Sequence, residues 1–502
     1  MKKKSPYFDR KNPRAPLCRN GSRQPLSGKC KPRGFIRRAR PVGEHRRCRI
    51  SSAPRKTGRK KGGAPLESKR ICLLNDSFPP QLDGVANAVV NYASILQRAG
   101  TEIAVGIPEY PGVEDHYSFP VVRYPSINTT EWLGYRAGYP FTMEPVQTLR
   151  NFRPDLIHCH CPVMSMVMAR TLRELTGKPI VLTYHTKFDI DVGRAVRSEF
   201  LQKEALRMLC NNIEAADEVW TVSHGAGENM RKLGYQGDYI IMENGVDFPK
   251  GRVPDAELRK LDAEYGLDPQ KPLFLFVGRM MWYKGIRIIL DALKMQKEKG
   301  LAFTAAFIGS GLNLEEIVAY RDSLGLQAEC LFPGAVQDRE LLRAWYCRAD
   351  LFLFPSTFDT NGIVVREAAA CGLPSVLVWG SCAAEGIMDG QNGLLIDENA
   401  ESLAAVIGEA CKHPEALRRI GENAAAQLYI SWEDAVARAA DRYDYLIEKY
   451  KDGIPDRPSL KFDGMFTALG GLIGGMSKVR EESARFRLKY RQHHFPFRGR
   501  YL

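Results

Sequence analysis

Apolar runs of strand length alternate with longer segments of helical period from about residue 69 onward. The runs lie at 70–76, 102–108, 156–161, 179–185, 218–223 and 239–245, and then at 272–279, 303–309, 329–334, 351–356, 374–380 and 393–396. They are continuous rather than alternating, which is typical of parallel strands that helices cover on both faces. The stretch DFPKGRVPDAE (247–257) is rich in Pro, Gly and charge, and predicts a linker. We therefore expect an α/β protein with two doubly wound, Rossmann-like domains that face each other across a cleft.

This pattern divides the chain into four segments. We predict a basic tail without packed structure at 1–68 and an N-terminal Rossmann-like domain at 69–249. A C-terminal Rossmann-like domain is expected at 250–430, followed by a C-terminal helix and a second basic tail at 431–502.

The positive charge belongs to the first tail. Residues 1–70 hold 24 Lys or Arg and three Asp or Glu, a net +21, so the remaining 432 residues carry a net −7 although the whole chain carries +14. The charge therefore does not indicate a specific nucleic-acid surface on the folded part. Three interpretations of the tail stay open: a solvated basic arm for anionic lipid or nucleic acid, an organelle leader, or upstream sequence from a mis-called start.

Cysteine usage and hydropathy bear on location. Most of the twelve cysteines stand alone in apolar or helical runs, which is typical of reduced thiols in a cytosolic protein. No run reaches the roughly 18–20 apolar residues that a membrane span needs. The region after residue 461 is apolar first and basic afterwards, so it suits either an anionic membrane surface or a helix packed on the body. We expect a cytoplasmic protein, with a peripheral position on the inner face of the membrane as the alternative.

Two cations stand at the start of the second domain. Arg279 follows Gly278 at the end of a strand, and Lys284 precedes Gly285 at the start of a helix. Both cations and the helix N-terminus could bind a diphosphate, which would then need no metal. The alternative is a pair of solvated side chains. The pattern is not a P-loop, because the motif ending in GK[ST] is absent.

The stretch FDTNGIVVREAAACGLP (358–374) places one acid in a loop and another in a helix. Asp359 follows a buried strand, and we expect a helix from Gly362 through Glu367 that ends at Gly372. At about 1.5 Å per residue the helix rises roughly 7–8 Å from Gly362 to Glu367, which would separate the two carboxylates by a span comparable to a diphosphate. They could accept hydrogen bonds from two ends of one ligand, to which the N–H groups of Asn361, Gly362 and Ile363 could also donate. The alternative is a surface loop with a solvated helix.

These motifs together carry a resemblance. VGRMMWYKG, then PSTFDTNGIVVREAAACGLPSVLVWG, then DGQNGLLI resemble the second domain of retaining family 4 glycosyltransferases of the GT-B fold. NDSFPPQLDGVANAVVNYASILQRAG, YHTKF and ENGVD are similar to the first domain of that family. The resemblance covers about residues 69–450 in the family's order.

The resemblance implies roles in the second domain, which would bind the nucleotide sugar. Arg279 and Lys284 would bind the donor diphosphate, and Glu367 would bind the ribose hydroxyls. Asp359 would occupy the first-acid position near the donor hexose. The family commonly has Glu in place of this Asp, and Gly-Phe-Gly in place of Thr-Asn-Gly, so the choice of hexose is open. The Thr-x-Gly form and YHTKFD resemble members that glycosylate lipids such as diacylglycerol.

The resemblance also implies roles in the first domain, which would face the acceptor. The loop Asp83-Gly84-Val85 would approach the donor phosphate and the acceptor, where glycine leaves room. His185, after the strand IVLTYH, would orient the donor sugar or the acceptor.

The stretch HCHC (158–161) suggests a metal site. Strand alternation places His158 and His160 on one face and the two cysteines on the other, and no second ligand pair at zinc spacing follows. We interpret His160 as a cleft residue and Cys159 as a core residue, and we expect neither a metal nor a cofactor.

The function expected from the resemblance is a retaining transfer of a hexose from a UDP- or GDP-sugar to a hydroxyl of a lipid or saccharide. Two alternatives stay open. One is another enzyme of the same fold, such as a sugar phosphorylase or a nucleotide-sugar epimerase. The other is a non-catalytic module that binds a sugar or lipid.

Overall fold

The computed structural model describes residues 68–81, 83–129, 136–188, 192–193, 198–455 and 464. Apart from residues 68 and 464, the predicted first tail and everything beyond residue 455 lie outside these residues. Among the helices of the described part, none has the length and apolar character that would let it cross a bilayer.

The strands form two parallel sheets, as the continuous apolar runs predict. The first sheet has the order β3-β2-β1-β6-β7-β8-β9 and the second has the order β12-β11-β10-β13-β14-β15. A short antiparallel pair, β4 with β5, completes the described strands. Their bounds are β1 (Arg70–Leu74), β2 (Glu102–Pro108), β3 (Val121–Tyr124), β4 (Ser126–Ile127), β5 (Ala137–Gly138), β6 (Leu156–Cys159), β7 (Ile180–Tyr184), β8 (Glu218–Thr221), β9 (Ile240–Ile241), β10 (Leu273–Val277), β11 (Thr304–Ile308), β12 (Cys330–Gly334), β13 (Leu351–Phe354), β14 (Ser375–Val378) and β15 (Leu394–Ile396).

Helices connect and cover these strands. Their bounds are α1 (Gly84–Arg98), α3 (Met143–Asn151), α4 (Met164–Thr176), α6 (Glu199–Glu214), α7 (His224–Lys232), α8 (Asp255–Tyr265), α9 (Ile286–Glu298), α10 (Leu314–Ser323), α11 (Arg339–Arg348), α12 (Ile363–Ala370), α13 (Ala400–Ala410), α14 (Pro414–Gln427) and α15 (Trp432–Lys449), with two 3₁₀ turns, η1 (Trp282–Lys284) and η2 (Cys382–Ala384). The predicted fold class, two Rossmann-like domains with a C-terminal helix, is confirmed.

The first sheet has a separate apolar core on each face. Ile71 and Leu73 of β1 point to the core that α1 and α15 complete. Cys72 and Leu74 point to the core on the other face, with residues of α3, α4, α6 and α7. This alternation explains why β1 is apolar at every one of these positions.

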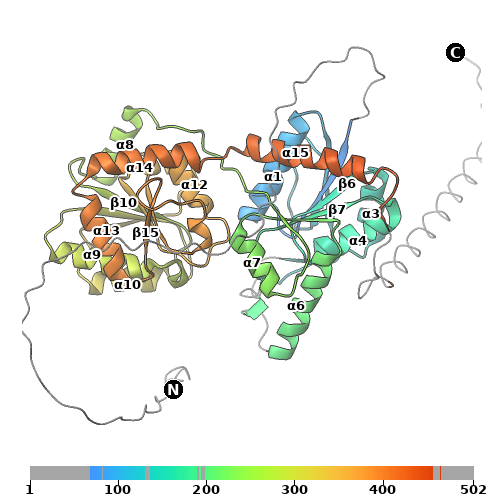
Figure 1. Cartoon of the computed structure of the whole chain (residues 1–502), viewed down its shortest axis with the longest axis horizontal. Helices are drawn as coiled ribbons and strands as arrows, with labels where there is room; N and C mark the ends of the chain where they lie inside the picture. Colours follow the sequence, from blue (N-terminus) through green and yellow to red (C-terminus); the bar gives the residue numbers. More distant parts are fainter. Residues whose placement is uncertain are drawn as a thin grey trace, which may run out of the picture. The chain divides into compact units, whose positions relative to one another are not determined.

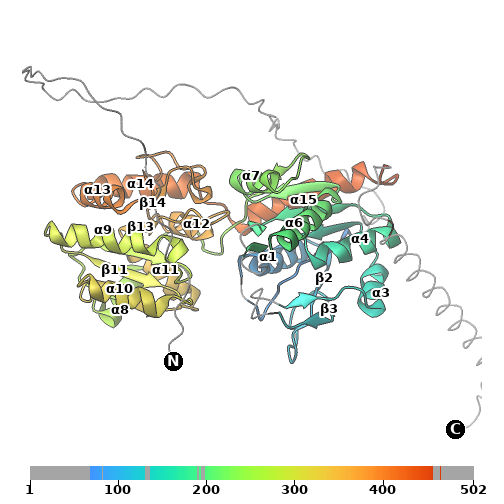
Figure 2. The ribbon, with the colours of Figure 1, turned by 90° about the horizontal axis from the view of Figure 1, so that it is seen from below.

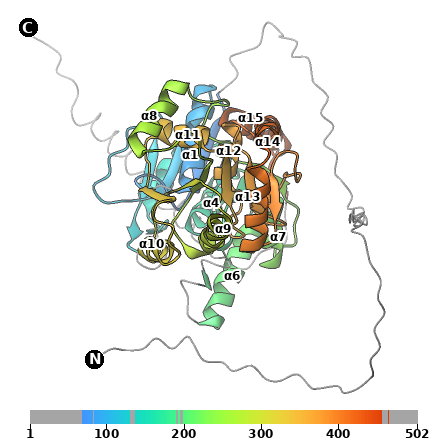
Figure 3. The ribbon, with the colours of Figure 1, turned by 90° about the vertical axis from the view of Figure 1, so that its left-hand side faces the viewer.

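The second sheet has one large core that includes residues from both of its faces. Helices α9, α10 and α13 cover one face, and α8, α12 and α14 cover the other (Figure 1). Helices α9 and α13 lie side by side along the first of these faces (Figure 3). Val246 and Phe248 belong to this core although they precede the predicted boundary at residue 250.

Helix α15 belongs to the first domain by its packing, which the sequence analysis did not predict. Trp432, Tyr443 and Leu446 are buried in the core that contains α1, and α15 lies beside α1 in Figure 1. The chain returns from α14 to α15 next to Gly245, where a Cβ would lie 2.4 Å from the backbone of Trp432.

Strand β3 was also missed by the sequence analysis. It pairs in parallel with β2 at the edge of the first sheet (Figure 2). Three of its four residues are only partly buried, and Pro120 and Pro125 flank it, so it shows no continuous apolar run.

Both sheets have a point at which the strand order reverses. In the first sheet it lies between β1 and β6, and in the second between β10 and β13. The crossover helices on the two sides of such a point lie on opposite faces, so a crevice forms outside the carboxyl ends of the central strands. Arg279 follows β10 and Asp359 follows β13, so both residues lie at the reversal point of the second sheet.

Two helical glycines of the second domain predict opposite responses to alanine. Alanine favours a helix over glycine by up to about 1 kcal/mol. A Cβ at Gly421 in α14 would lie 2.0 Å from the backbone oxygen of Gly372, whereas a Cβ at Gly408 in α13 would lie 3.1 Å from the side-chain amide of Gln296, which can shift more easily than a backbone atom. We expect Gly421→Ala to lower the free energy of unfolding by about 1–3 kcal/mol, and Gly408→Ala to leave it unchanged or raise it. Urea unfolding measures both, and equal stabilisation by the two variants would contradict the tight contact between α14 and Gly372.

Candidate functional site

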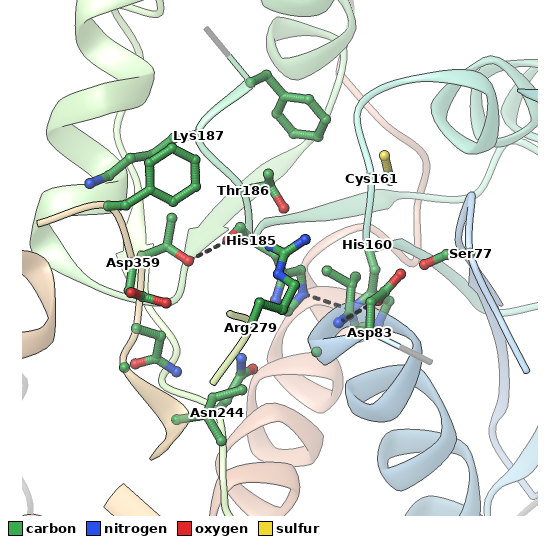
Figure 4. Close-up of a pocket in the computed structure, with 18 of the residues that line it drawn as sticks. Ser77, Asp83, His160, Cys161, His185, Thr186, Lys187, Asn244, Arg279 and Asp359 are labelled. Carbon is green, nitrogen blue, oxygen red and sulfur yellow. Dashed lines mark hydrogen bonds between the residues drawn. The ribbon is translucent and has the colours of Figure 1, made fainter. Parts of the chain in front are cut away.

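A cavity of about 430 Å³ lies where the carboxyl ends of strands from both sheets meet. Figure 4 shows the Arg279 side chain projecting between Asp359, from the second domain, and His160, from the first. Most residues predicted for the site line this cavity: Gly84, His185, Arg279, Lys284, Asp359, Asn361, Gly362 and Ile363. Glu367 is not among the lining residues.

The two predicted cations differ in their surroundings. Arg279 is exposed to solvent in the cavity. Lys284 ends η1, is only 7% exposed, and donates from Nζ to Oδ1 of Asp359 at 2.6 Å. The other carboxylate oxygen of Asp359 accepts a hydrogen bond from Ser356 Oγ at 2.6 Å. In this structure Lys284 therefore already has a counter-ion, and Arg279 projects freely into the cavity.

Helix α12 begins at the cavity, as the sequence predicts. Gly362 is its N-cap residue with φ of 58°, the left-handed region that favours glycine. The side chain of Asn361 is buried, and neither its amide nitrogen nor its amide oxygen has a partner among the described residues. The start of α12 thus places free backbone N–H groups and an unpaired amide beside the cations.

Glu367 lies deeper in α12, is buried, and is not among the residues that line the cavity. Its Oε1 accepts a hydrogen bond from Arg339 Nη2 at 2.8 Å, and its Oε2 accepts one from the Tyr346 hydroxyl at 3.0 Å. Burial raises the pKa of Glu367, and the charge of Arg339 opposes that rise. The structure therefore does not bring the two acids of 358–374 to one cavity, and a role of Glu367 at a ribose stays a prediction.

The first domain contributes the N-terminus of α1. Asp83 caps this helix, because its Oδ1 accepts hydrogen bonds from the backbone N–H of Val85 at 2.8 Å and of Ala86 at 2.7 Å. Gly84 lines the cavity, and a Cβ there would meet only Ile363 Cδ1, at 3.6 Å. Protein packing among the described residues therefore does not require glycine at position 84, and the close approach of a substrate there stays a prediction.

Buried histidines lie on and beneath the cavity wall. His185 Nε2 lies 3.1 Å from His160 Nδ1. Burial lowers the pKa of His185 to about 3 and lowers the pKa of His160 well below its ordinary value, so both imidazoles are neutral near pH 7. His158 lies under this pair, between the hydroxyls of Tyr443 and Thr183, and its pKa is also well below the ordinary value because of burial.

The HCHC stretch does not form a metal site in the described part of the chain. His160 lines the cavity and Cys159 lies in an apolar core, as interpreted from the alternation. Across the described ranges, no three His, Cys, Asp or Glu residues come together in a metal-binding group.

The sequence analysis missed several residues of the cavity wall. Asn75, Asp76 and Ser77 follow β1, and Asn244 follows β9. Asp76 accepts hydrogen bonds from the backbone N–H of Ser165 at 2.8 Å and from its hydroxyl at 2.9 Å, and burial raises the pKa of Asp76 to about 6. The rule that ligands lie at the carboxyl ends of strands would have found the residues after β1.

Hydrogen bonds tie the loop of Asp359 to the first domain. The hydroxyl of Thr360 donates to the backbone oxygen of His185 at 2.7 Å, and the backbone oxygen of Thr360 accepts from the Ser223 hydroxyl at 2.5 Å. Lys187 Nζ donates to the backbone oxygen of Thr357 at 3.3 Å. The carboxylate of Glu385 accepts from the first N–H groups of α7. These hydrogen bonds therefore connect the two domains directly beside the cavity.

Two sequence families match the two halves of the chain. The family described as Glycosyltransferase Family 4 matches residues 82–249, and the family described as Glycosyl transferases group 1 matches residues 259–427. Together they span both Rossmann-like domains.

Two individual relatives are each less than 30% identical to this chain. Sulfoquinovosyl transferase SQD2 of Arabidopsis thaliana is 28% identical over 316 residues, which are 61% of this chain but only 59% of SQD2. Alpha-monoglucosyldiacylglycerol synthase of Acholeplasma laidlawii is 24% identical over 368 residues, covering 71% of this chain and 91% of that enzyme.

Solved structures share the fold. Anabaena Alr3699/HepE in complex with UDP matches with a TM-score of 0.60 at 20% identity, over 75% of this chain and 100% of that one. Sucrose-phosphate synthase of Thermosynechococcus elongatus matches with a TM-score of 0.61 at 21% identity, over 76% of this chain and 100% of that one.

The buried histidines predict a loss of stability on acidification. Each one is neutral in the folded protein and binds a proton when unfolded, so its contribution is present above about pH 6.5 and is lost as the pH falls. We expect His158→Gln to reduce the slope of unfolding free energy against pH by about 1.4 kcal/mol per pH unit between pH 5.5 and 4.5. Urea unfolding at several pH values measures the slope. The raised pKa of Asp76 makes stability change with pH in the opposite direction, but by the same amount in the wild-type protein and in His158→Gln.

Tyr443→Phe is the matched control, because it removes the hydroxyl that contacts His158 but keeps the imidazole. It should lower stability without changing the slope. An unchanged slope in His158→Gln would contradict a buried neutral imidazole at this position.

Proposed function

Because the chain belongs to the family 4 and group 1 glycosyltransferases, which share the GT-B fold, we propose that it moves a hexose from a UDP- or GDP-sugar to a hydroxyl acceptor with retention of configuration. The observation that carries this proposal is the cavity itself. It joins two cations and a helix N-terminus from the second domain to a glycine loop and a neutral histidine from the first.

The second domain would hold the donor. Arg279 and Lys284 offer charge-assisted hydrogen bonds to a diphosphate, and the free N–H groups at the start of α12 add a positive helix end. The two cations can neutralise the departing diphosphate, so the proposal includes no metal and no cofactor. Glu367 would bind the ribose only if the nucleotide reaches past Arg339, which now contacts its carboxylate.

The first domain would place the acceptor. His185 is neutral and buried beside the cavity, so it can exchange hydrogen bonds with a hydroxyl without adding charge. Gly84 leaves room for a substrate at the start of α1. In the transfer, the bond from the anomeric carbon to the diphosphate oxygen breaks while the acceptor oxygen bonds to the same face of that carbon. The departing diphosphate oxygen takes the acceptor proton, so no protein base is required.

A membrane lipid such as diacylglycerol is the acceptor class that we propose first. The relative from Acholeplasma laidlawii is an alpha-monoglucosyldiacylglycerol synthase, named for a glucosylated diacylglycerol. The strongly basic segment at residues 1–70 would suit a peripheral position at an anionic, inner membrane face. A saccharide acceptor is the alternative within the same reaction.

Donor binding tests the cation assignment. We expect wild-type protein to bind UDP or GDP, and the double variant Arg279→Ala, Lys284→Ala to lose this affinity by at least about 100-fold, because two charge-assisted contacts disappear. Calorimetric titration measures the affinity. The matched control is Lys294→Ala with Lys299→Ala, which removes two cations of the α9 region that do not line the cavity. Normal binding by the first double variant would refute the donor site.

Acceptor choice is tested by turnover. We expect release of UDP or GDP from a panel of nucleotide sugars to rise several-fold when vesicles containing diacylglycerol are added, because the vesicles supply the hydroxyl acceptor. Soluble sugars serve as the comparison, and the anomeric configuration of the product is read by NMR. Inversion at the anomeric carbon would contradict the same-face transfer.

A further inference from the structure

The ion pair between Lys284 and Asp359 stands inside the proposed donor site. We propose that Asp359 is a positioning residue, a fixed counter-ion that holds Lys284 and limits its pull on the donor diphosphate, rather than a ligand of the donor hexose. The inference rests on the proposed function and assigns the first acid of the 358–374 motif a role different from the one that family resemblance implies.

Both oxygens of the Asp359 carboxylate are committed to protein donors. Oδ1 accepts from Lys284 Nζ at 2.6 Å and Oδ2 accepts from Ser356 Oγ at 2.6 Å. The side chains of Lys284 and Asp359 are 8% and 20% exposed, and Ser356 is fully buried. Burying the Lys284 ammonium without a counter-ion would destabilise the folded protein. The Asp359 carboxylate therefore stabilises the fold even when the cavity holds no ligand.

The backbone builds this geometry. Gly285 has φ of 77°, and a Cβ there would lie 2.3 Å from the backbone oxygen of Pro355. Because residue 285 is glycine, the turn that carries Lys284 can pack closely against Pro355. Pro355 follows β13 and immediately precedes Ser356. This backbone contact between Gly285 and Pro355 places the Lys284 turn beside the Asp359 loop. The ion pair is therefore positioned by main-chain packing.

The pair changes the charge that a diphosphate meets. Asp359 cancels one of the two cations, and the exposed Arg279 is the one without an ion-pair partner in the described ranges. Lys284 keeps two N–H donors for phosphate oxygens while the third stays on Asp359. The donor is thus bound by correctly aimed groups with a reduced net attraction, which favours release of the nucleotide diphosphate after transfer.

The hexose must then be contacted by other groups. Aspartate is one methylene shorter than glutamate, and here it is turned toward Lys284 and Ser356. Asn361 lies two residues further on and lines the cavity with both amide atoms unpartnered among the described residues. Its amide can both donate to and accept from a sugar hydroxyl, whereas the hydroxyl of the nearer Thr360 already donates to the backbone oxygen of His185.

The test separates binding of the diphosphate from binding of the hexose. UDP and GDP are first titrated into the full-length wild-type protein, and the tighter one is used throughout. We expect Asp359→Asn to bind that nucleotide about five- to tenfold more tightly, because a negative charge beside the phosphate site is gone. Its affinities for the UDP- or GDP-sugars should shift by the same factor, so the preference among hexoses stays unchanged. The parent nucleoside, which has no phosphate, should bind both proteins equally.

Matched variants decide whether the effect passes through Lys284. Asp359→Glu keeps the charge and should bind the nucleotide within about twofold of wild type. In the background of Lys284→Gln, adding Asp359→Asn should give a clearly smaller gain in affinity than it gives alone, which is the coupling expected of a direct pair. Asp359→Ser also removes the charge and replaces Asp359→Asn if circular dichroism shows that the latter does not fold.

Three results would overturn the inference: weaker nucleotide binding in Asp359→Asn, nucleotide affinity unchanged while hexose preference changes, or equal gains with and without Lys284. The second result would return Asp359 to the role of hexose ligand. Absence of UDP and GDP binding by the wild-type protein would instead refute the proposed function, so the two failures are distinguishable.

Discussion

A parallel sheet whose crossover helices leave in opposite directions cannot close the gap beside its two central strands, and both sheets of this chain have such a gap. The residues after β10 and β13 and the residues after β1 and β6 are therefore left to line a cavity rather than to fill a core. Every other feature of the site depends on this constraint. The glycines at 285 and 362 stand where the chain passes close to other protein atoms at these ends, Gly84 lines the cavity, and the helices α1 and α12 begin beside it.

Helix α15 shows that the first domain is completed by sequence from the far end of the chain. One face of its sheet has α1 as a cover, and the buried face of α15 supplies Trp432, Ala435, Val436 and Tyr443 beside it. Tyr443 also reaches His158, which packs against His160, the partner of His185. Stability of the first core and placement of a cavity histidine thus share one contact with the C-terminal helix. A substitution in α15 that moves Tyr443 would therefore be expected to shift the histidines of the cavity wall, because close-packed side chains transmit displacement.

The sequence predicted those features that follow from local pattern. Continuous apolar runs located twelve of the strands, and the turn residues at Gly285 and Gly362 placed the loops that carry Lys284 and Asp359. Strand β3 escaped because an edge strand flanked by prolines has no run of buried positions. The packing of α15 could not be predicted, because the amphipathic pattern of a helix does not indicate which domain the helix covers. The partners of the two acids escaped for the same reason: Arg339 and Lys284 lie 28 and 75 residues from them along the chain, and only the fold brings them together.

If the cavity binds a diphosphate as proposed, the pairing of Lys284 with Asp359 explains how such a site can be stable without its ligand. Two unpaired cations close together in a half-buried cavity would repel one another and lose hydration, so the folded state would be penalised until ligand arrived. One carboxylate removes most of that penalty, but it also weakens the attraction for the ligand. Leaving Arg279 exposed and Lys284 neutralised is a compromise between these demands. Solvent stabilises the first cation and Asp359 the second, so each can turn to a phosphate without first breaking the fold. The proposed transfer would need such a compromise, because a nucleotide diphosphate that is bound too tightly after transfer would block the next donor.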